Sequence, residues 1–257
     1  MPDIDEGLKG LRVLVTGGSR GLGEATVRRF VSAGATVLTA SRSRPGRDSG
    51  AAFIAADLST PEGVADLGRR VIAEVGGVDV LVNNAGAASA PAPTLSRSDD
   101  SWRADLEMNL LSAVRLDRAL VPGMVEQGSG VVVHVSSIAS KLPQRSEASY
   151  AAAKAALNVY SRELATEVGA NGVRVVCVLP GFVLTDGADA HLQRMAEQQG
   201  VSTEQVTQQI VDHLNLPMGR PGEPEDVAEM IAFLASGRAK WLTGAQFRVD
   251  GGIIPTV

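Results

Sequence analysis

The sequence predicts an α/β fold in which a parallel seven-stranded sheet is covered by helices on both faces. Short runs rich in β-branched residues alternate along the chain with longer stretches of helical periodicity. The short runs are apolar at nearly every position, as expected for strands buried on both faces of a parallel sheet. No linker rich in Pro, Gly or Ser interrupts the 257 residues, so we expect one domain, 1–257.

Each element can be placed from its own residues. The seven strands are expected in the β-branched runs at 11–15, 36–40, 53–56, 78–82, 131–135, 173–179 and 246–249. The main helices are expected at 21–33, 61–75, 99–126, 149–168 and 224–234. The second of these begins after Ser59 or Thr60 as its cap, with Pro61 in its first turn. The third is expected to bend near Pro122.

Two connections depart from this alternation. Only SRPGRDSGA separates the second strand from the third, and it contains Pro45 and Gly46. We therefore expect a short, non-helical crossover there. Two polar helical segments are expected within 186–216, between the sixth strand and the last helix. This segment is expected to form a flap over the carboxyl edge of the sheet.

The composition limits the classes of function. The chain is 44% hydrophobic and 21% charged, and its net charge of −5 argues against nucleic acid or an anionic membrane as the main partner. Its single cysteine, Cys177, excludes an intramolecular disulfide and lies in an apolar run, as a buried small hydrophobe would. The acidic N-terminal stretch resembles no signal peptide, and no apolar run approaches the ~20 residues of a membrane span. We expect a cytoplasmic enzyme.

The first strand is followed by TGGSRGLGE, from Thr16 to Glu24, with glycines at positions 17, 21 and 23. Glycine allows a tight turn from strand to helix and lets the backbone approach a pyrophosphate at the helix N-terminus. Glycine also serves ordinary turns, but the place of this loop between strand and helix favours a dinucleotide site. The absence of a G-K-[ST] ending argues against a nucleoside-triphosphate loop.

The second strand ends in TASRSR, where Ser41 and Arg42 stand in place of the acidic residue that usually contacts the ribose of NAD. Arg20, in the glycine loop, can reach the same ribose. Two guanidinium groups suit a 2′-phosphate, which favours NADP(H) over NAD(H). The alternative is that the arginines of this turn only decorate the surface.

Tyr150 and Lys154 lie four residues apart in an alanine-rich helix, and therefore on one face. A free tyrosine has a pKa of ~10, too high for proton exchange near neutral pH. A nearby ammonium favours the phenolate and lowers that pKa. The pair is thus expected to be an acid/base, Tyr150, whose pKa Lys154 lowers.

These motifs together resemble the short-chain dehydrogenase/reductase family. Six motifs occur in the order typical of that family: TGGSRGLG, NNAG at 83–86, Asn109, the serines at 136 and 137, Tyr150-x-x-x-Lys154 and Pro180–Gly181. The resemblance covers 11–252, nearly the whole chain. It implies a Rossmann-type doubly wound sheet, and it is strongest to NADPH-dependent carbonyl or ketoacyl reductases of the compact single-domain branch.

The resemblance also implies roles for individual residues. Ser137 would hydrogen-bond the substrate oxygen, Asn109 would hold a water in a proton relay, and Lys154 would also bind the nicotinamide ribose. The residues implied as cofactor-binding are Gly17, Ser19, Arg20, Gly21, Leu22, Gly23, Ser41, Arg42, Asp57, Leu58, Asn84, Ala85, Gly86, Tyr150, Lys154, Pro180, Gly181, Val183 and Thr185.

Simpler interpretations exist for several of these residues. Tyr150 could be a core aromatic, and Ser137 a turn residue at a strand end. Asp57 could be an exposed loop carboxylate, and Thr185 a helix cap. His134 stands where the family often has asparagine, which we interpret as a difference in packing rather than chemistry. Asn83 could merely close its turn.

The expected function is the NADP(H)-dependent interconversion of a ketone and a secondary alcohol, without a catalytic metal. The rivals are a lyase or epimerase on the same fold and a non-enzymatic dinucleotide sensor. Segments 87–97, 138–148 and the flap are expected to line the pocket. They offer Leu142, Leu184, Leu192, Met195 and Leu214, which suit a medium-sized, mainly apolar ketone.

A homo-oligomer is also expected. Helices 99–126 and 149–168 carry apolar residues on more than one stripe, Trp102, Leu111 and Leu116 among them, and a second stripe must be buried elsewhere. The resemblance implies a four-helix contact across a two-fold axis. The tail IIPTV offers a second apolar surface, so we expect a tetramer, or otherwise a dimer.

Overall fold

A parallel seven-stranded sheet forms the centre of the molecule. The computed structural model describes residues 6–255, and the strand order is β3-β2-β1-β4-β5-β6-β7 with every pair parallel. The strands are β1 (Arg12–Thr16), β2 (Thr36–Ser41), β3 (Ala52–Ala55), β4 (Val80–Asn83), β5 (Gly130–Val135), β6 (Val173–Pro180) and β7 (Gln246–Val249). The predicted doubly wound sheet is therefore confirmed, since the strand order runs outward in both directions from β1 and β4.

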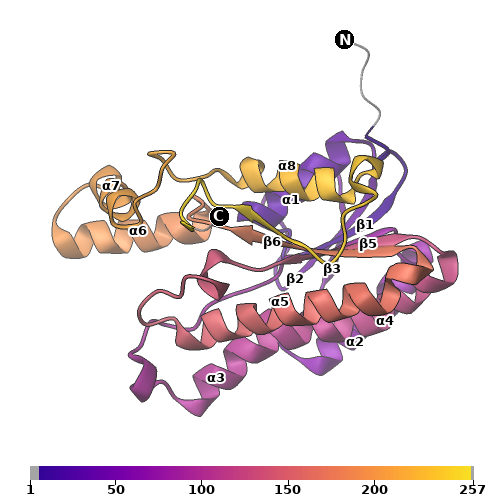
Figure 1. Cartoon of the computed structure of the whole chain (residues 1–257), viewed down its shortest axis with the longest axis horizontal. Helices are drawn as coiled ribbons and strands as arrows, with labels where there is room; N and C mark the ends of the chain where they lie inside the picture. The colour runs from indigo at the N-terminus through magenta and orange to yellow at the C-terminus, as the bar shows by residue number, and fades with distance from the viewer. Residues whose placement is uncertain (1–5, 256–257) are drawn as a thin grey trace, which may run out of the picture.

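Helices cover both faces of the sheet (Figure 1). Helices α1 (Gly21–Ser32) and α8 (Pro224–Ala235) pack together on one face. Helices α2 (Pro61–Val75), α4 (Ser112–Gln127) and α5 (Ala148–Val168) cover the other. Two hydrophobic cores result because successive side chains of a strand point to opposite faces. In β1, Val13 and Val15 pack toward α1 and α8, whereas Leu14 packs toward α2 and α4.

The long helix expected at 99–126 is interrupted at its middle, which the sequence did not predict. It consists of α3 (Asp99–Leu106), one wide π-helical turn (Glu107–Leu111) and α4, which continues through Pro122 to Gln127. The irregular turn thus surrounds Asn109, and Pro122 lies inside α4. A π turn carries one extra residue, and such turns occur frequently at functional sites. The short crossover between β2 and β3 contains no helix, as predicted.

The segment expected as a flap forms the helices α6 (Asp186–Gln199) and α7 (Thr203–His213). They lie beside the main body of the fold, beyond the carboxyl end of β6 (Figure 1). Leu192, Ala196 and Val206 form a small core between the two helices. Val211 and Leu216 pack on Ile138, Ile253 and Ile254. The helical pair is therefore attached to the segment that follows Ser137.

His134 belongs to a buried polar network, which agrees with its interpretation as a packing residue. Its Nε2 lies 2.9 Å from Asp117 Oδ2, and both side chains are almost fully buried. Asn83 Nδ2 donates to the other oxygen of Asp117 at 2.7 Å. Asp117 thus joins β4 and β5 to α4. The last two residues of the IIPTV tail, 256 and 257, lie outside the described residues.

Candidate active site

The glycine loop forms the turn from β1 to α1, and its glycines are required by geometry. Gly17 and Gly21 have φ values of 71° and 54°, which side chains rarely adopt. A Cβ on Gly23 would overlap the carbonyl oxygen of Gly17, because strand and helix approach closely there. Arg20, the residue before α1, is extended and its side chain does not cap the helix. The side chain of Arg20 therefore does not occupy the first backbone N–H groups of α1, which can bind an anion such as a pyrophosphate.

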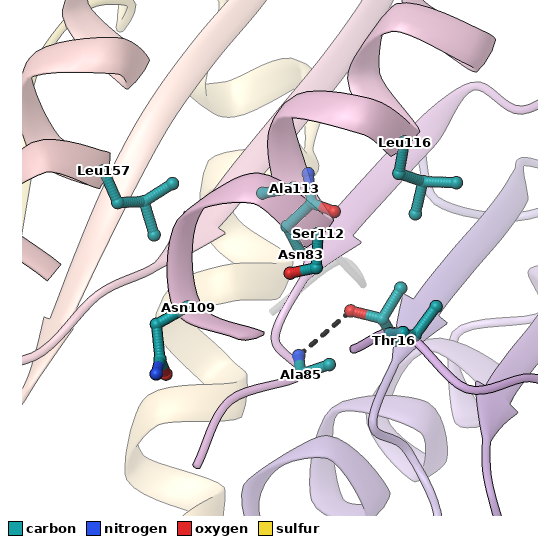
Figure 2. Close-up of a pocket in the computed structure, with 9 residues that line it drawn as sticks. Thr16, Asn83, Ala85, Asn109, Ser112, Ala113, Leu116 and Leu157 are labelled. Atoms are coloured by element: carbon teal, nitrogen blue, oxygen red, sulfur yellow. Dashed lines mark hydrogen bonds between the residues drawn. The ribbon is translucent and has the colours of Figure 1, made fainter. Parts of the chain in front are cut away.

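Thr16 connects this loop to the NNAG segment after β4, a role that the sequence analysis missed. Its Oγ accepts hydrogen bonds from the backbone N–H groups of Asn84 and Ala85, each at 3.0 Å. Figure 2 shows the bond from Ala85. Asn84 Nδ2 donates in return to the Thr16 carbonyl at 2.8 Å. The two strands at the reversal of strand order thereby end in one hydrogen-bonded unit. The signal available in the sequence was the polar residue at the end of an apolar strand.

A small cavity lies behind this unit. It has a volume of about 10 Å³ and is lined by Thr16, Leu58, Asn83, Ala85, Asn109, Ser112, Ala113, Leu116 and Leu157 (Figure 2). That volume is at the lower limit for one water molecule. The cavity is therefore a packing feature beneath the site and not a substrate pocket. Leu58, expected to bind cofactor, has its side chain packed in this core, so only its backbone remains for that role.

The end of β2 carries the charges expected for a 2′-phosphate. Arg20 and Arg42 are exposed, and neither forms a salt bridge within residues 6–255. Arg44 instead lies 5.1 Å above the ring of Phe53. Asp57 is an exposed residue whose pKa is lowered by hydrogen bonds from Ser59, with a smaller effect of Arg42. Asp57 and Arg42 therefore lie near each other at this end of the site.

The segment after β6 returns to the glycine loop. A Cβ on Gly181 would lie 2.7 Å from Cα of Asp250, so this position also requires glycine. Val183 pairs with Gly222, and Thr185 follows as the N-cap of α6, accepting from Ala188 N at 3.2 Å. The cap interpretation of Thr185 is thus confirmed. A Cβ on Gly21 would lie 3.1 Å from Thr185 Cβ, so the same threonine also lies against the glycine loop.

Ser137, Tyr150 and Lys154 meet at the carboxyl end of β5. Ser137 follows the strand and accepts from Ala139 N at 3.1 Å, and its hydroxyl is also hydrogen-bonded to Tyr150. Tyr150 lies in the first turn of α5 and is half-buried. Lys154 is only 3% exposed, and its Nζ donates to the Val135 carbonyl at 2.8 Å, 5.8 Å from the Tyr150 ring centroid. The three side chains predicted to act together are therefore adjacent.

The predicted direction of the Tyr150 pKa shift is wrong for this structure. Burial raises the pKa of the Tyr150 phenol, and the hydrogen bond with Ser137 only partly offsets that effect. The charges of Glu147 and Asp105 raise the same pKa further. Burial also lowers the pKa of Lys154 to about 8. The charged form of Lys154, which was expected to act on Tyr150, is therefore itself disfavoured by burial. Sequence reasoning accounted for the charge of Lys154 but not for the burial of both groups.

Asn109 and Gly86 complete this part of the site. Asn109 Nδ2 donates to the carbonyls of Ala87 and Asp105 at 2.7 and 2.9 Å, and its Oδ1 accepts from Ala87 N at 3.2 Å. A Cβ on Gly86 would lie 2.9 Å from Asn109 Oδ1 and 3.2 Å from Lys154 Nζ. The NNAG backbone therefore passes between Asn109 and Lys154. The side chain of Asn109 holds that backbone in place.

Some predicted pocket residues lie elsewhere. Leu192 is 1% exposed in the core between α6 and α7, so its assignment to the pocket is wrong. Leu184 and Met195 pack against the same core, and Leu214 against the neighbouring one. Leu142 remains partly exposed. Among the described residues, no group of three or more His, Cys, Asp or Glu side chains is placed to hold a metal ion. Within 6–255 none of the helices combines the length and hydrophobicity of a membrane span.

The fold and the arrangement of these side chains are those of a dinucleotide-dependent α/β oxidoreductase. A family model described as enoyl-(acyl carrier protein) reductase matches residues 17–254. The chain is 33% identical to the 3-oxoacyl-[acyl-carrier-protein] reductase FabG of Vibrio cholerae, with 96% of this chain and 98% of that protein covered. It is 32% identical to the FabG of Escherichia coli, with 95% and 98% covered. The chain therefore belongs to the short-chain dehydrogenase/reductase family.

Solved structures agree with this assignment. The L-sorbose reductase of Gluconobacter frateurii, complexed with NADPH and L-sorbose, superimposes with a TM-score of 0.94 at 34% identity, over 99% of this chain and all of that one. The ligand-free aldohexose dehydrogenase of Thermoplasma acidophilum gives a TM-score of 0.88 at 29% identity, over 97% and 96% of the two chains. The likeness extends over the whole chain.

The burial of Lys154 predicts an unusual dependence of stability on pH. Because its pKa falls from 10.5 to about 8 on folding, the unfolded chain binds more protons between these values. The stability of the cofactor-free protein should therefore rise with pH across that window, by up to about 3 kcal/mol from this residue. Lys154→Met should remove this rise. Urea unfolding at several pH values between 7 and 10.5 measures the free energy of unfolding of both proteins.

The control is Lys240→Met, which removes an exposed lysine and should leave the pH dependence of the wild-type protein unchanged. Parallel stability curves for the wild type and Lys154→Met would contradict the assignment of a charge-disfavouring environment to Lys154.

Proposed function

We propose that this protein interconverts a ketone and a secondary alcohol with NADP(H), and that Tyr150 transfers the proton. The observation that carries the proposal is the group formed by Ser137, Tyr150 and Lys154 at the carboxyl edge of the sheet. Ligands bind at that edge in doubly wound folds, at the point where the strand order reverses. The glycine loop and the NNAG segment end at the same edge.

The residues around the edge fit a dinucleotide. The glycine loop and the N-terminus of α1 would hold the pyrophosphate. Ser41, Arg20 and Arg42 would hold the 2′-phosphate, and Asp57 with the Leu58 backbone would hold the adenine. The remainder of the dinucleotide site would be lined by two segments: Asn84, Ala85 and Gly86 after β4, and Pro180, Gly181, Val183 and Thr185 at the end of β6 and after it. The remaining members of the proposed set are Ser19 and Leu22 in the glycine loop. Bound NADPH supplies the hydride, as nicotinamide cofactors do.

The side chains have separate tasks in reduction. Ser137 hydrogen-bonds the carbonyl oxygen, and Tyr150 donates its phenolic proton to that oxygen as it becomes a hydroxyl. The positive charge of Lys154 stabilises the phenolate that remains, and its ammonium would also bind the nicotinamide ribose. Asn109 uses its side chain to hold the NNAG backbone, so a relay water would bind at the backbone of the wide turn around it.

The substrate class remains a prediction, and two candidates differ in polarity. The sequence suggests a medium-sized, mainly apolar ketone, and FabG proteins are named for 3-oxoacyl substrates. The L-sorbose reductase structure instead contains a sugar. Glu147 favours the polar candidate: it is half-buried just before α5, and its charge acts on Tyr150. A carboxylate there can accept hydrogen bonds from substrate hydroxyls. Oxidation of NADPH with ketoses, 3-oxoacyl thioesters and simple ketones, compared by kcat/KM, decides between them.

Tyr150→Phe tests the proposed mechanism. The variant keeps the ring and removes the proton, so turnover should be lost almost completely while NADPH binding is largely kept. Turnover on the best ketone of the panel and fluorescence titration with NADPH measure the two properties. Retention of even a tenth of the wild-type turnover would mean that Tyr150 is not the acid/base. A lyase, an epimerase or a non-enzymatic sensor would show no net oxidation of NADPH with any ketone.

Arg42→Asp tests the 2′-phosphate site. Replacement of the guanidinium by a carboxylate should weaken NADPH binding at least tenfold, which corresponds to about 1.4 kcal/mol. NADH should gain relative to NADPH. Arg47→Asp is the matched control, because Arg47 is exposed in the same crossover but outside the proposed site. An unchanged preference in Arg42→Asp, or an equal loss in Arg47→Asp, contradicts a specific contact.

We further propose that the chain acts as one domain in the cytoplasm, as a homotetramer. Val159, on α5, is 65% exposed and supports a contact across that helix. Leu116 does not, because it is 1% exposed and packs toward the sheet, contrary to the prediction of an outer stripe. Light scattering coupled to size exclusion should give about four times the chain mass of 26.7 kDa. A mass near that of one chain at micromolar concentration excludes the oligomer, and twice the chain mass indicates the dimer.

A further inference from the structure

Asp105 is a buried carboxylate beside the active site. It lies in α3, one turn before Asn109, and is 2% exposed. One oxygen accepts from both the backbone N–H and the hydroxyl of Ser89, each at 2.9 Å. The other accepts a short hydrogen bond from the hydroxyl of Ser149, which is fully buried and directly precedes Tyr150. A buried carboxylate is costly unless its oxygens are hydrogen-bonded, and here both are.

Arg97 brings a compensating charge to the same place. Its Nη1 lies 3.9 Å from Asp105 Oδ2, and only 1% of its side chain is exposed. Its Nη2 donates to the carbonyl of Ser146 at 2.5 Å. Ser146 is one of two non-glycine residues with positive φ in the described chain, at 71°. Arg97 therefore stabilises an unfavourable backbone turn four residues before Tyr150.

The contacts of Asp105 and Arg97 connect three segments that the active site needs. Ser89 and Arg97 belong to the loop expected to line the pocket. Asp105 belongs to the helix that leads to Asn109, whose side chain donates to the Asp105 carbonyl. Ser149 belongs to the first turn of α5. The loop, α3 and the Tyr150 turn are thus joined through one buried carboxylate.

We propose that Asp105 is a positioning residue, which holds Tyr150 in its reactive place through the hydrogen bond from Ser149, with Arg97 holding the adjacent turn. This inference rests on the proposed role of Tyr150 as the acid/base. Small displacements of a reacting group are expensive in catalysis, so a contact made by the neighbouring residue affects turnover more than cofactor binding.

The charge of Asp105 gives the proposal a second, independent readout. The ionisable groups that act on Tyr150 are Asp105 from α3, Glu147 at the start of α5 and Lys154 one turn later, and Ser137 adds a hydrogen bond. Asp105 and Glu147 raise the pKa of Tyr150. Reduction requires protonated Tyr150. Removal of the Asp105 charge should therefore move the alkaline limb of the kcat profile to lower pH.

The experiment compares Ser149→Ala and Asp105→Asn with the wild-type enzyme, using NADPH and the best ketone of the panel. Ser149→Ala removes one hydrogen bond but keeps the Asp105–Arg97 pair, so it should fold. We expect its kcat to fall about tenfold while NADPH affinity stays within about twofold. Asp105→Asn should lower kcat similarly and also shift the alkaline limb to lower pH.

The matched control is Asp100→Asn, which removes the same charge from an exposed position of α3 and should leave kcat, NADPH affinity and the pH profile unchanged. Wild-type kcat in Ser149→Ala, or an unshifted limb in Asp105→Asn, overturns the proposal. Parallel losses of turnover, NADPH affinity and melting temperature also overturn it, because they indicate only a structural role. Tyr150→Phe separates the two proposals: if it stays active, the proposed function fails, and if it is inactive while Ser149→Ala is normal, only this inference fails.

Discussion

The parallel pairing of β1 with β4 is the constraint on which the rest of the site depends. It brings the ends of two strands side by side although they lie far apart in the chain. The hydroxyl of Thr16 then accepts from the backbone of both Asn84 and Ala85, so the glycine loop and the NNAG segment have one fixed relative position. Because parallel strands end at a common edge, β5 and β6 deliver Ser137 and Gly181 to the same side.

Burial of polar groups is the second physical theme of the molecule. Three ionisable side chains lie under the surface and are hydrogen-bonded to other elements: Lys154 donates to β5, whereas Asp105 and Asp117 accept. Such groups contribute little to stability and disfavour every arrangement that leaves them unpaired. Asp117 with His134 joins α4 to the sheet, away from the chemistry. Asp105 and Lys154 lie on the active-site side, where they connect the loop 87–97, α3 and α5 to the end of β5.

The site also shows how burial can reverse an argument based on charge. Two residues one turn apart in a helix are neighbours, and a lysine beside a tyrosine ordinarily favours the phenolate. Here Tyr150 is half-buried and Lys154 is almost fully buried, so desolvation disfavours both charged forms. The pKa of the phenol rises, and that of the amine falls to about 8. At neutral pH Lys154 is therefore still mostly charged, whereas Tyr150 keeps its proton, as the proposed role of donor in reduction requires.

The sequence by itself determined the class of fold, the seven strands, the short crossover after β2 and the order of the motifs. These features depend on local patterns: apolar runs buried on both faces, glycines at turns and caps at helix ends. Only the tertiary structure decided the π turn at Asn109, the place of Leu192 between α6 and α7, the direction of the Tyr150 pKa shift and the contacts of Asp105. Each of these depends on which segments pack against one another, because solvent exclusion and contacts between Ser89, Asp105 and Ser149 are properties of the assembled layers and of no single stretch of chain.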